Sequence, residues 1–405
     1  MKKYNSDRWN MTWLKSKPVN IIWKVLSSKG AKVYFVGGCV RDSVQARKIK
    51  DIDIATDALP SEVIELAKLA NLKVIKTGLE HGSVAIIVQN ERFDITTFRS
   101  DIVTDGRHST VRFSLNILDD AMRRDFTMNA LYMTIDGEIL DPISGFEDLV
   151  SGRVRFIGEP EKRIREDYLR VLRYFRFLTI YGEKAESLDH STVDACSNAI
   201  FGLKTLSNDR IWEELQKILL ADNPNLSLKL MYSSGVLEAI LPFAKLENLH
   251  RFLILEKKFK IKFKEINRLA VLNLSQVRFW AKRFPFKREQ RRWLDTLLVN
   301  LNDSSSLRVR SYKYGADLTI SAYAIFKSHL SKTLDSKDLG EINAGSSQSF
   351  PINNSDLLQY YSQSKALGDE FKRLKDLWLS SNLELDRHNL LTELKKKAIA
   401  NDIGS

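Results

Sequence analysis

Two aspartates, Asp51 and Asp53, alternate with isoleucines in a segment that the pattern predicts to be a short strand. Carboxylates two residues apart on a strand point to the same face. Such a pair can hold Mg²⁺ ions that bridge the oxygens of a triphosphate and activate an attacking hydroxyl. An Asp-x-Asp pair alone more often marks a solvated strand edge, so the elements around it decide its meaning.

The segment before the aspartates is the first of these elements. Residues 32–36 predict a buried strand, and Gly37 and Gly38 follow it directly, ahead of Arg41 and a predicted helix. Glycines at this place let backbone N–H groups approach a phosphate closely, and the N-terminus of the next helix adds its dipole. A lone Gly-Gly pair is more often a tight turn, but the order strand, Gly-Gly, helix and Asp-x-Asp strand is much more specific.

This order of elements resembles the polymerase-β-like nucleotidyltransferases. The resemblance implies that Asp51 and Asp53 are catalytic and bind the metal, with Mg²⁺ as the cofactor. It also implies a third catalytic carboxylate from a neighbouring strand, for which Asp94 is the candidate. A cap at the end of a strand is an equally open interpretation of Asp94.

Four motifs narrow the resemblance to the class II CCA-adding tRNA nucleotidyltransferases and bacterial poly(A) polymerases. Residues 37–42 with 51–56 resemble the opening motif, and residues 123–130 resemble the second. Residues 141–149 resemble the third, a hinge-like link, although the family usually has one more glycine there. Residues 166–170, with the sequence Glu-Asp-Tyr-Leu-Arg, resemble the fourth.

The resemblance implies a nucleotide pocket whose fourth motif reads the base. In the family, the Asp and Arg of that motif bind the Watson–Crick edge of CTP or ATP, here Asp167 and Arg170. A carboxylate can accept from the amino group that C and A both carry, and a guanidinium can donate to the ring acceptor beside it. An amphipathic helix with a solvated arginine face is the alternative interpretation. The residues expected to bind the nucleotide are Gly38, Arg41, Arg124, Asp125, Asn129, Asp167, Arg170, Arg173 and Arg176.

Residues 101–111 resemble the flexible loop that, in the family, allows the site to switch from CTP to ATP, with Asp105, Gly106 and Arg107 as its central residues. Enzymes that add only CC lack this loop, so its presence favours full CCA addition or addition of A alone. Poly(A) polymerases usually carry an Arg- and Phe-rich insertion before the strand that contains Asp94, which this chain lacks. An RNA-binding module without chemistry is a further alternative, and the intact acidic pair argues against it.

The predicted elements indicate an α+β protein, with an N-terminal polymerase-β-like nucleotidyltransferase head followed by an all-α neck, body and tail. Strands are expected near residues 84–88 and 93–98, and the pattern becomes helical from about Glu161, with one helix over 163–181. The expected divisions are an N-terminal extension at 1–30, a head at 31–150, a neck at 151–245, and a body and tail at 246–405.

The composition agrees with a nucleic-acid substrate. The 405 residues carry a formal net charge of +12, and Lys and Arg displace the counterions of a polyanion such as tRNA. Residues 257–292 are basic with interleaved aromatic residues, and we expect them to bind the tRNA backbone, although a solvated basic helix is the alternative. The segment around residues 350–378 resembles the tail of proteobacterial members. The expected partners are therefore tRNA, with CTP and ATP as substrates.

Two cysteines, Cys39 and Cys196, lie far apart and cannot form a disulfide framework or a zinc cluster. We therefore expect a cytoplasmic protein. The N-terminus lacks the apolar stretch of a signal peptide, and no apolar run approaches the roughly 18 residues of a membrane span.

Overall fold

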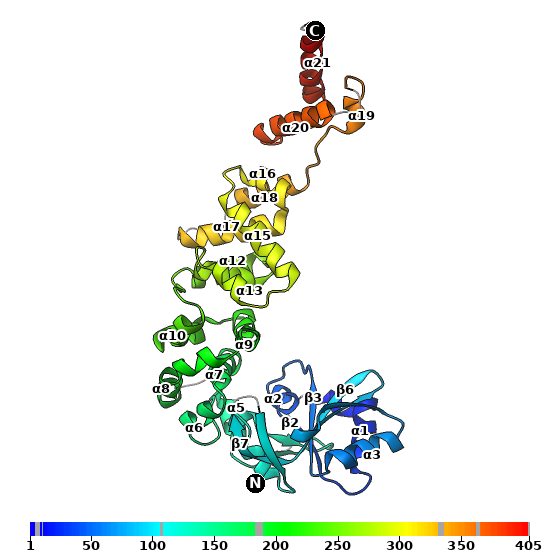
Figure 1. Cartoon of the computed structure of the whole chain (residues 1–405), viewed down its shortest axis with the longest axis vertical. Coiled ribbons are helices and arrows are strands. Elements are labelled where there is room, and N and C mark those ends of the chain that lie inside the picture. The colour runs from blue at the N-terminus through cyan, green and yellow to red at the C-terminus, as the bar shows by residue number, and fades with distance from the viewer. Residues whose placement is uncertain are drawn as a thin grey trace. The chain divides into compact units, whose positions relative to one another are not determined.

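The computed structural model describes residues 1–4, 9, 11–105, 108–182, 189–330, 336–361 and 365–403. The chain forms two compact units, Met1–Pro242 and Phe243–Ser405. The first unit contains the β-sheets and the second is helical, which confirms the α+β expectation (Figure 1). The finer division into four segments stays a prediction, and the border between the two units lies close to the one expected at residue 245.

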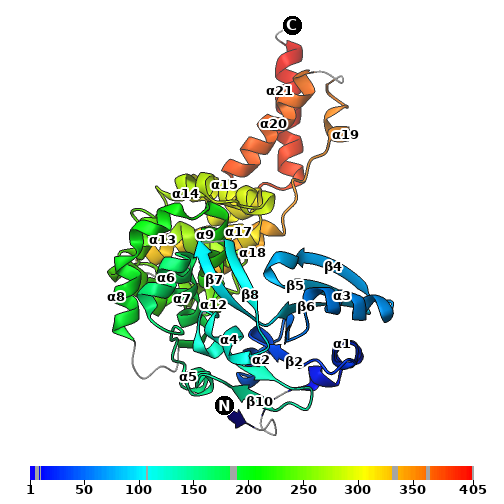
Figure 2. The ribbon, with the colours of Figure 1, turned by 60° about the horizontal axis from the view of Figure 1, so that its bottom comes forward.

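The first unit is built on a mixed sheet with the strand order β1-β10-β9-β2-β3-β6-β5-β4. Neighbouring strands are antiparallel except for β3 and β6, which are parallel. Strands β7 and β8 form a separate two-stranded hairpin (Figure 2). The strands are β1 Lys2–Tyr4, β2 Val33–Val36, β3 Ile52–Thr56, β4 Lys73–Gly78, β5 Ser83–Val88, β6 Glu91–Thr97, β7 Arg99–Asp105, β8 His108–Phe113, β9 Tyr132–Met133 and β10 Ile139–Asp141.

The pairing of β3 with β6 positions the acidic residues. Ile54 and Ile95 are register partners and are buried, since strand residues alternate between the two faces. The adjacent register pair is Asp53 with Asp94. Two carboxylates that are 41 positions apart in the sequence therefore lie side by side on neighbouring strands.

The described residues among the N-terminal 30 contribute a strand and a helix to the first unit. Lys2–Tyr4 form the edge strand β1, which pairs with β10. Helix α1 (Lys17–Ser27) begins at Ser16, whose hydroxyl accepts a hydrogen bond from the Val19 amide at 3.4 Å. Its buried residues Val19, Ile22 and Leu26 recur at helical spacing, and this apolar face packs beside α3 (Pro60–Leu69) against the sheet.

The helix expected over residues 163–181 is wrong as a single element, because the chain breaks at Asp167. Helix α6 (Pro160–Glu166) ends there, and α7 (Leu169–Tyr181) begins two residues later. Asp167 has the extended dihedral angles φ −154° and ψ 109°, and its carboxylate accepts a hydrogen bond from the Leu169 amide at 3.0 Å. This local bond offers the backbone an alternative to the helix.

The remaining helices of the first unit surround the sheet and build the neck. They are α2 Gly38–Val44, α4 Ile117–Met122, α5 Gly145–Ser151, α8 His190–Asn198, α9 Asn208–Leu220, α10 Asn225–Ser233 and α11 Val236–Ile240.

The second unit is built from helices alone in the part of the chain that the structure describes. Residues 243–405 carry 29 Lys and Arg against 18 Asp and Glu, so almost all of the net charge of +12 belongs to this unit. No helix among the described residues is long and apolar enough to cross a membrane. The helices are α12 Leu249–Phe259, α13 Lys264–Leu272, α14 Val277–Arg283, α15 Arg288–Asn302, α16 Leu307–Tyr314, α17 Ala316–His329, α18 Ser336–Ser346, α19 Asn354–Leu357, α20 Lys365–Ser380 and α21 Arg387–Ile403.

Candidate active site

A cavity of about 650 Å³ in the first unit brings most of the predicted site residues together. Seven arginines and four aspartates line it, so its charge favours a polyanionic ligand. Eleven of the residues predicted from the sequence are among the lining residues: Gly38, Arg41, Asp51, Asp53, Arg124, Asp125, Asn129, Asp167, Arg170, Arg173 and Arg176.

The glycine turn and Arg41 form one wall of this cavity. Gly37 has φ +71°, a conformation that residues with a side chain rarely adopt, and it connects β2 to α2. The Arg41 guanidinium donates to the Asn129 side chain at 2.6 Å and to Asp42 at 3.0 Å. It also lies 4.5 Å from the ring centroid of Tyr181. Arg41 is thus fixed in place beside the backbone N–H groups of the turn, where it can meet a phosphate.

Asp51 directly precedes β3, Asp53 is the second residue of that strand, and both line the cavity. Burial, together with the negative charges of Asp94 and Asp51, raises the pKa of Asp53 to about 6, and the positive charge of Arg124 opposes this shift. A cation would relieve this crowding of like charges. Among the described residues no three His, Cys, Asp or Glu side chains form a complete metal cage. Mg²⁺ needs none, because it usually takes one or two carboxylates together with substrate phosphates.

Asp94 lies beside Asp53 but does not line the cavity. Its carboxylate accepts hydrogen bonds from the Arg92 guanidinium, the shorter at 2.7 Å. Asp94 is in the middle of β6, so it is not a cap at a strand end. Its role as a third catalytic carboxylate stays a prediction.

Arg124 is held by two partners that the sequence analysis did not single out. Its guanidinium donates to Asp120 at 2.8 Å and to the Tyr132 hydroxyl at 3.2 Å, and that hydroxyl donates to Asp120 at 2.7 Å. Burial alone would raise the pKa of Asp120, but Arg124 and Arg123 lower it to about 2. The sequence feature that could have revealed the Asp120–Arg124 pair is their spacing of four residues, which places both on one face of a helical turn.

Asp125 connects the head to the neck helix α7. It accepts hydrogen bonds from Arg173, at 2.8 Å for Nε, and from the Asn129 amide at 2.8 Å. Burial works against ionisation of Asp125, yet Arg173 and Asn129 hold its pKa well below the usual range. Arg173 therefore lines the cavity already paired with Asp125.

Asp167 and Arg170, predicted as neighbours on one helix, have different partners. Asp167 accepts from the Arg210 guanidinium at 2.7 Å. Arg170 donates from Nη1 to the Glu166 carboxylate at 2.6 Å and to the Arg163 carbonyl at 2.7 Å. Both side chains line the cavity, and Arg210 lines it as well.

Known proteins resemble this chain in sequence and in fold. The model of the Poly A polymerase head domain matches residues 33–155, and that of the probable RNA and SrmB-binding site of polymerase A matches residues 187–247. CCA tRNA nucleotidyltransferase 1, mitochondrial, of Mus musculus is 31% identical over 390 residues, which cover 92% of this chain and 88% of the mouse protein. The chain belongs to the CCA tRNA nucleotidyltransferase family.

Other members of the CCA tRNA nucleotidyltransferase family agree with this assignment. The human mitochondrial protein is 32% identical and covers 89% of this chain and 86% of its own length. The Bacillus subtilis CCA-adding enzyme is 36% identical over 240 residues, 58% of each chain. The solved Bacillus stearothermophilus CCA-adding enzyme in complex with CTP has the same fold, with a TM-score of 0.75 and 23% identity, over 96% of this chain and 100% of that one. The protein is therefore a nucleotidyltransferase, as expected.

The loop expected to govern the switch between nucleotides in this family falls partly on residues that the structure describes. Asp105 is the last residue of β7 and pairs with His108 of β8. Gly106 and Arg107 lie outside the described residues. The loop thus remains a prediction from the resemblance to the CCA tRNA nucleotidyltransferases.

A buried ion pair joins the neck helices α7 and α9 next to the cavity of this nucleotidyltransferase. Arg176 donates to Glu214, whose side chain is 5% exposed. Replacing Glu214 with alanine will leave the Arg176 guanidinium buried without its partner. We expect the free energy of unfolding to fall by about 3 kcal/mol, because a lone buried charge is costly. Chemical denaturation monitored by circular dichroism measures the change.

The neighbouring residue Glu213 is the matched control for this prediction. Its side chain is exposed, so Glu213→Ala removes the same charge without uncovering a buried partner. We expect its free energy of unfolding to stay within about 0.5 kcal/mol of the wild type. Equal losses for both variants would contradict a structural role for the Arg176–Glu214 pair.

Proposed function

We propose that this chain adds CCA to the 3′ end of tRNA from CTP and ATP, without a nucleic-acid template, and releases pyrophosphate. The observation that carries the proposal is the cavity itself. It combines two carboxylates for the reacting end of a nucleotide, an arginine-rich wall for its triphosphate, and the Asp167 and Arg170 pair for its base. A fold alone does not imply a function, so the proposal rests on this arrangement of side chains.

The residues of the chain perform separable tasks in this proposal. The glycine turn and Arg41 bind the triphosphate, and Arg124 lies near the sugar and phosphates. Arg173 and Arg176 complete the pocket. Asp51 and Asp53 would hold Mg²⁺, which when bound supplies the charge that lowers the pKa of the tRNA 3′-hydroxyl and neutralises the leaving pyrophosphate. The 3′-oxygen forms a bond to the α-phosphorus as the bond to pyrophosphate breaks.

In this proposal, the preference for C and A follows from the hydrogen-bonding groups that Asp167 and Arg170 do not use within the protein. The Asp167 carboxylate can accept from the amino group of C or A. Arg170 uses Nη1 within the protein, and its Nε and Nη2 make no hydrogen bond to any of the described residues. They can therefore donate to the ring acceptor of the base. U and G present a carbonyl where C and A present an amino group, so two acceptors would face each other.

Addition to a tRNA that ends at the discriminator base tests this proposal directly. CTP alone should give CC ends, and CTP with ATP should give CCA ends. Addition of A alone to a tRNA ending in CC, without any addition of C, would favour an A-adding enzyme, and arrest at CC would favour a CC-adding one. Chains of A would indicate a poly(A) polymerase, and no transfer at all would favour an RNA-binding module.

The loop gives a sharper test of full CCA addition. Deleting residues 104–107 should lower the rate of A addition about 100-fold and leave C addition within about threefold of the wild type, because a switch between two states requires contacts that differ between them. Single-turnover rates on tRNA ending in C and in CC measure both steps. An equal loss of both additions would contradict the assignment of the loop to the switch.

We also propose that the protein works in a reducing compartment, with the cytoplasm as the first candidate. Its two cysteines are free and buried among the described residues. This proposal is separate from the reaction, since relatives from mouse and human are named as mitochondrial proteins. Fractionation of cells that produce the full-length protein would test it.

A further inference from the structure

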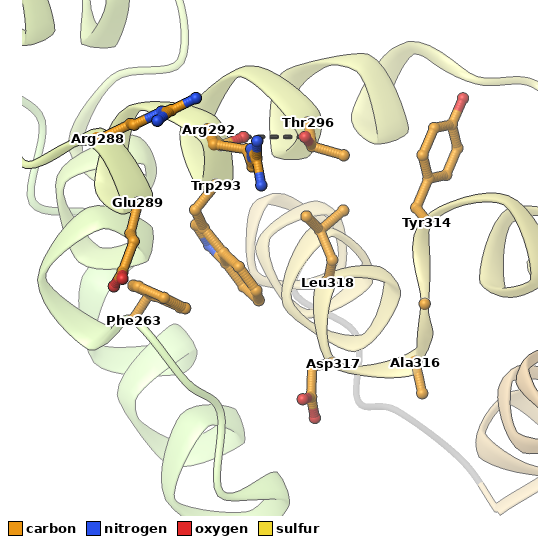
Figure 3. A pocket seen from close by; sticks show the side chains of 11 residues that line it. Phe263, Arg288, Glu289, Arg292, Trp293, Thr296, Tyr314, Ala316, Asp317 and Leu318 are labelled. Carbon is orange, nitrogen blue, oxygen red and sulfur yellow. Dashed lines mark hydrogen bonds between the residues drawn. The ribbon is translucent and has the colours of Figure 1, made fainter.

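A second cavity, of about 670 Å³, lies within the helical second unit, apart from the residues assigned to the reaction. This volume is in the range of about 300–1,000 Å³ that is common for ligand sites. Helices α15 and α17 contribute most of its walls, with Phe263 just before α13 and Tyr314 at the end of α16 (Figure 3). Its lining residues include Phe263, Arg288, Arg292, Trp293 and Leu318, together with two carboxylates: Glu289, and Asp317, which accepts a hydrogen bond from Lys262 at 2.6 Å.

Two aromatic rings form a platform in this cavity. The rings of Phe263 and Trp293 stack with centroids 4.5 Å apart and an interplanar angle of 28°. The Trp293 indole donates to the buried Asn267 side chain at 3.0 Å, which fixes the ring. Phe263 has φ +50°, an unfavourable conformation for a bulky residue. Both rings are only half-buried, so the platform retains surface for another planar group.

Two cations stand on the same helix as Trp293. Arg288 and Arg292 are four residues apart on α15, so their like charges are neighbours on the helix surface and repel each other. Both are exposed, and neither side chain makes an ion pair or hydrogen bond with any residue that the structure describes. An anion bound between them would relieve the repulsion. The surplus of positive charge in residues 243–405 favours the same kind of ligand.

We infer that this cavity binds one unstacked nucleotide of the substrate RNA, with its base on the Phe263–Trp293 platform and its phosphate on Arg288 and Arg292. The inference rests on the proposed function, in which tRNA is the substrate. A planar base with an adjacent phosphate is the ligand that matches an aromatic surface beside two guanidiniums. The site adds base stacking to the contacts with the RNA backbone that a basic surface alone supplies.

Phe263→Gly tests the platform without removing a charge. Glycine readily adopts a positive φ, so the variant keeps the backbone conformation of residue 263 while it deletes the ring. We expect its Kd for tRNA lacking CCA to rise about tenfold, because stacking on one aromatic residue is worth about this factor or more. Its kcat at saturating tRNA and its KM for CTP should match the wild type. Phe326→Ala removes an exposed ring outside the cavity and outside residues 257–292, and should leave the Kd unchanged.

The arginine pair is tested by salt dependence, which remains informative if Phe263→Gly does not fold. Arg288→Ala/Arg292→Ala should weaken tRNA binding and reduce the slope of log Kd against log salt by about one. The control Lys337→Ala/Lys372→Ala removes two exposed charges of the same unit that lie outside residues 257–292 and do not line the cavity. A folded Phe263→Gly variant with wild-type Kd, or equal effects of the two double variants, would overturn the inference. Wild-type protein that transfers no nucleotide to tRNA would instead overturn the proposed function.

Discussion

Asp53→Asn will abolish nucleotide transfer, with a fall in kcat of at least about 1,000-fold, while the Kd for tRNA stays within about twofold. The carboxylate of Asp53 faces the cavity beside Asp51 and lies in register with Asp94. Its loss removes a ligand for the cation that would neutralise the leaving pyrophosphate. Binding of tRNA should persist, because the phosphate contacts come from basic residues elsewhere. Single-turnover transfer of labelled ATP and a filter-binding assay measure the two quantities.

Glu91→Gln is the matched control, since Glu91 is an exposed carboxylate at the start of β6. It removes one negative charge from the same unit and should keep wild-type transfer. If Asp53→Asn kept a tenth of the wild-type rate, the assignment of the metal site to Asp51 and Asp53 would be wrong.

Asp167→Ala will lower the use of CTP and ATP and narrow their advantage over UTP and GTP by roughly 100-fold. Two buried polar groups without a partner cost about 1–3 kcal/mol each, and loss of the carboxylate removes that penalty for U and G. Relative incorporation of all four nucleotides by the variant measures the change. Because Asp167 also accepts from Arg210 and from the Leu169 amide, the variant's stability should be measured in parallel.

Arg210→Ala separates the two tasks of Asp167. It removes the ion pair that holds the carboxylate and keeps the carboxylate itself, so we expect a loss of rate with the preference for C and A largely retained. If Asp167→Ala were less stable but kept the wild-type preference, Asp167 would serve only to end α6 and begin α7, and the hypothesis of a protein template would fail for this residue.

Sequence reasoning located the cavity because its residues come in ordered motifs. The motif follows the order strand, turn, helix and strand, and it contains Gly38, Arg41, Asp51 and Asp53. Each of these local patterns is ambiguous alone, but their order indicates a nucleotide site. The structure brings these residues together with Arg124, which lies 71 positions after Asp53. The α+β class could be predicted because the spacing of apolar residues changes from a strand pattern to a helical pattern near residue 161.

The parts that sequence reasoning missed depend on contacts between elements. Apolar residues continue at helical spacing through Ile164, Tyr168 and Val171, so periodicity could not reveal the break at Asp167. A hydrogen bond from the Leu169 amide to the Asp167 carboxylate accompanies that break. The pairs Asp167–Arg210 and Arg176–Glu214 depend on how α7 packs beside α9, and residues 38 or more positions apart carry no mutual signal in one sequence.

The uneven distribution of charge between the two units has an evolutionary consequence. The arginines around the cavity are mostly bound to carboxylates, so exchanging one of them disturbs a paired structure. Many Lys and Arg residues of the second unit, such as Arg278 and Arg292, stand on exposed helix surfaces. A lineage that changes its internal salt or its tRNA pool could therefore adjust the affinity for RNA by substitutions in residues 243–405 and leave the chemistry of the first unit untouched.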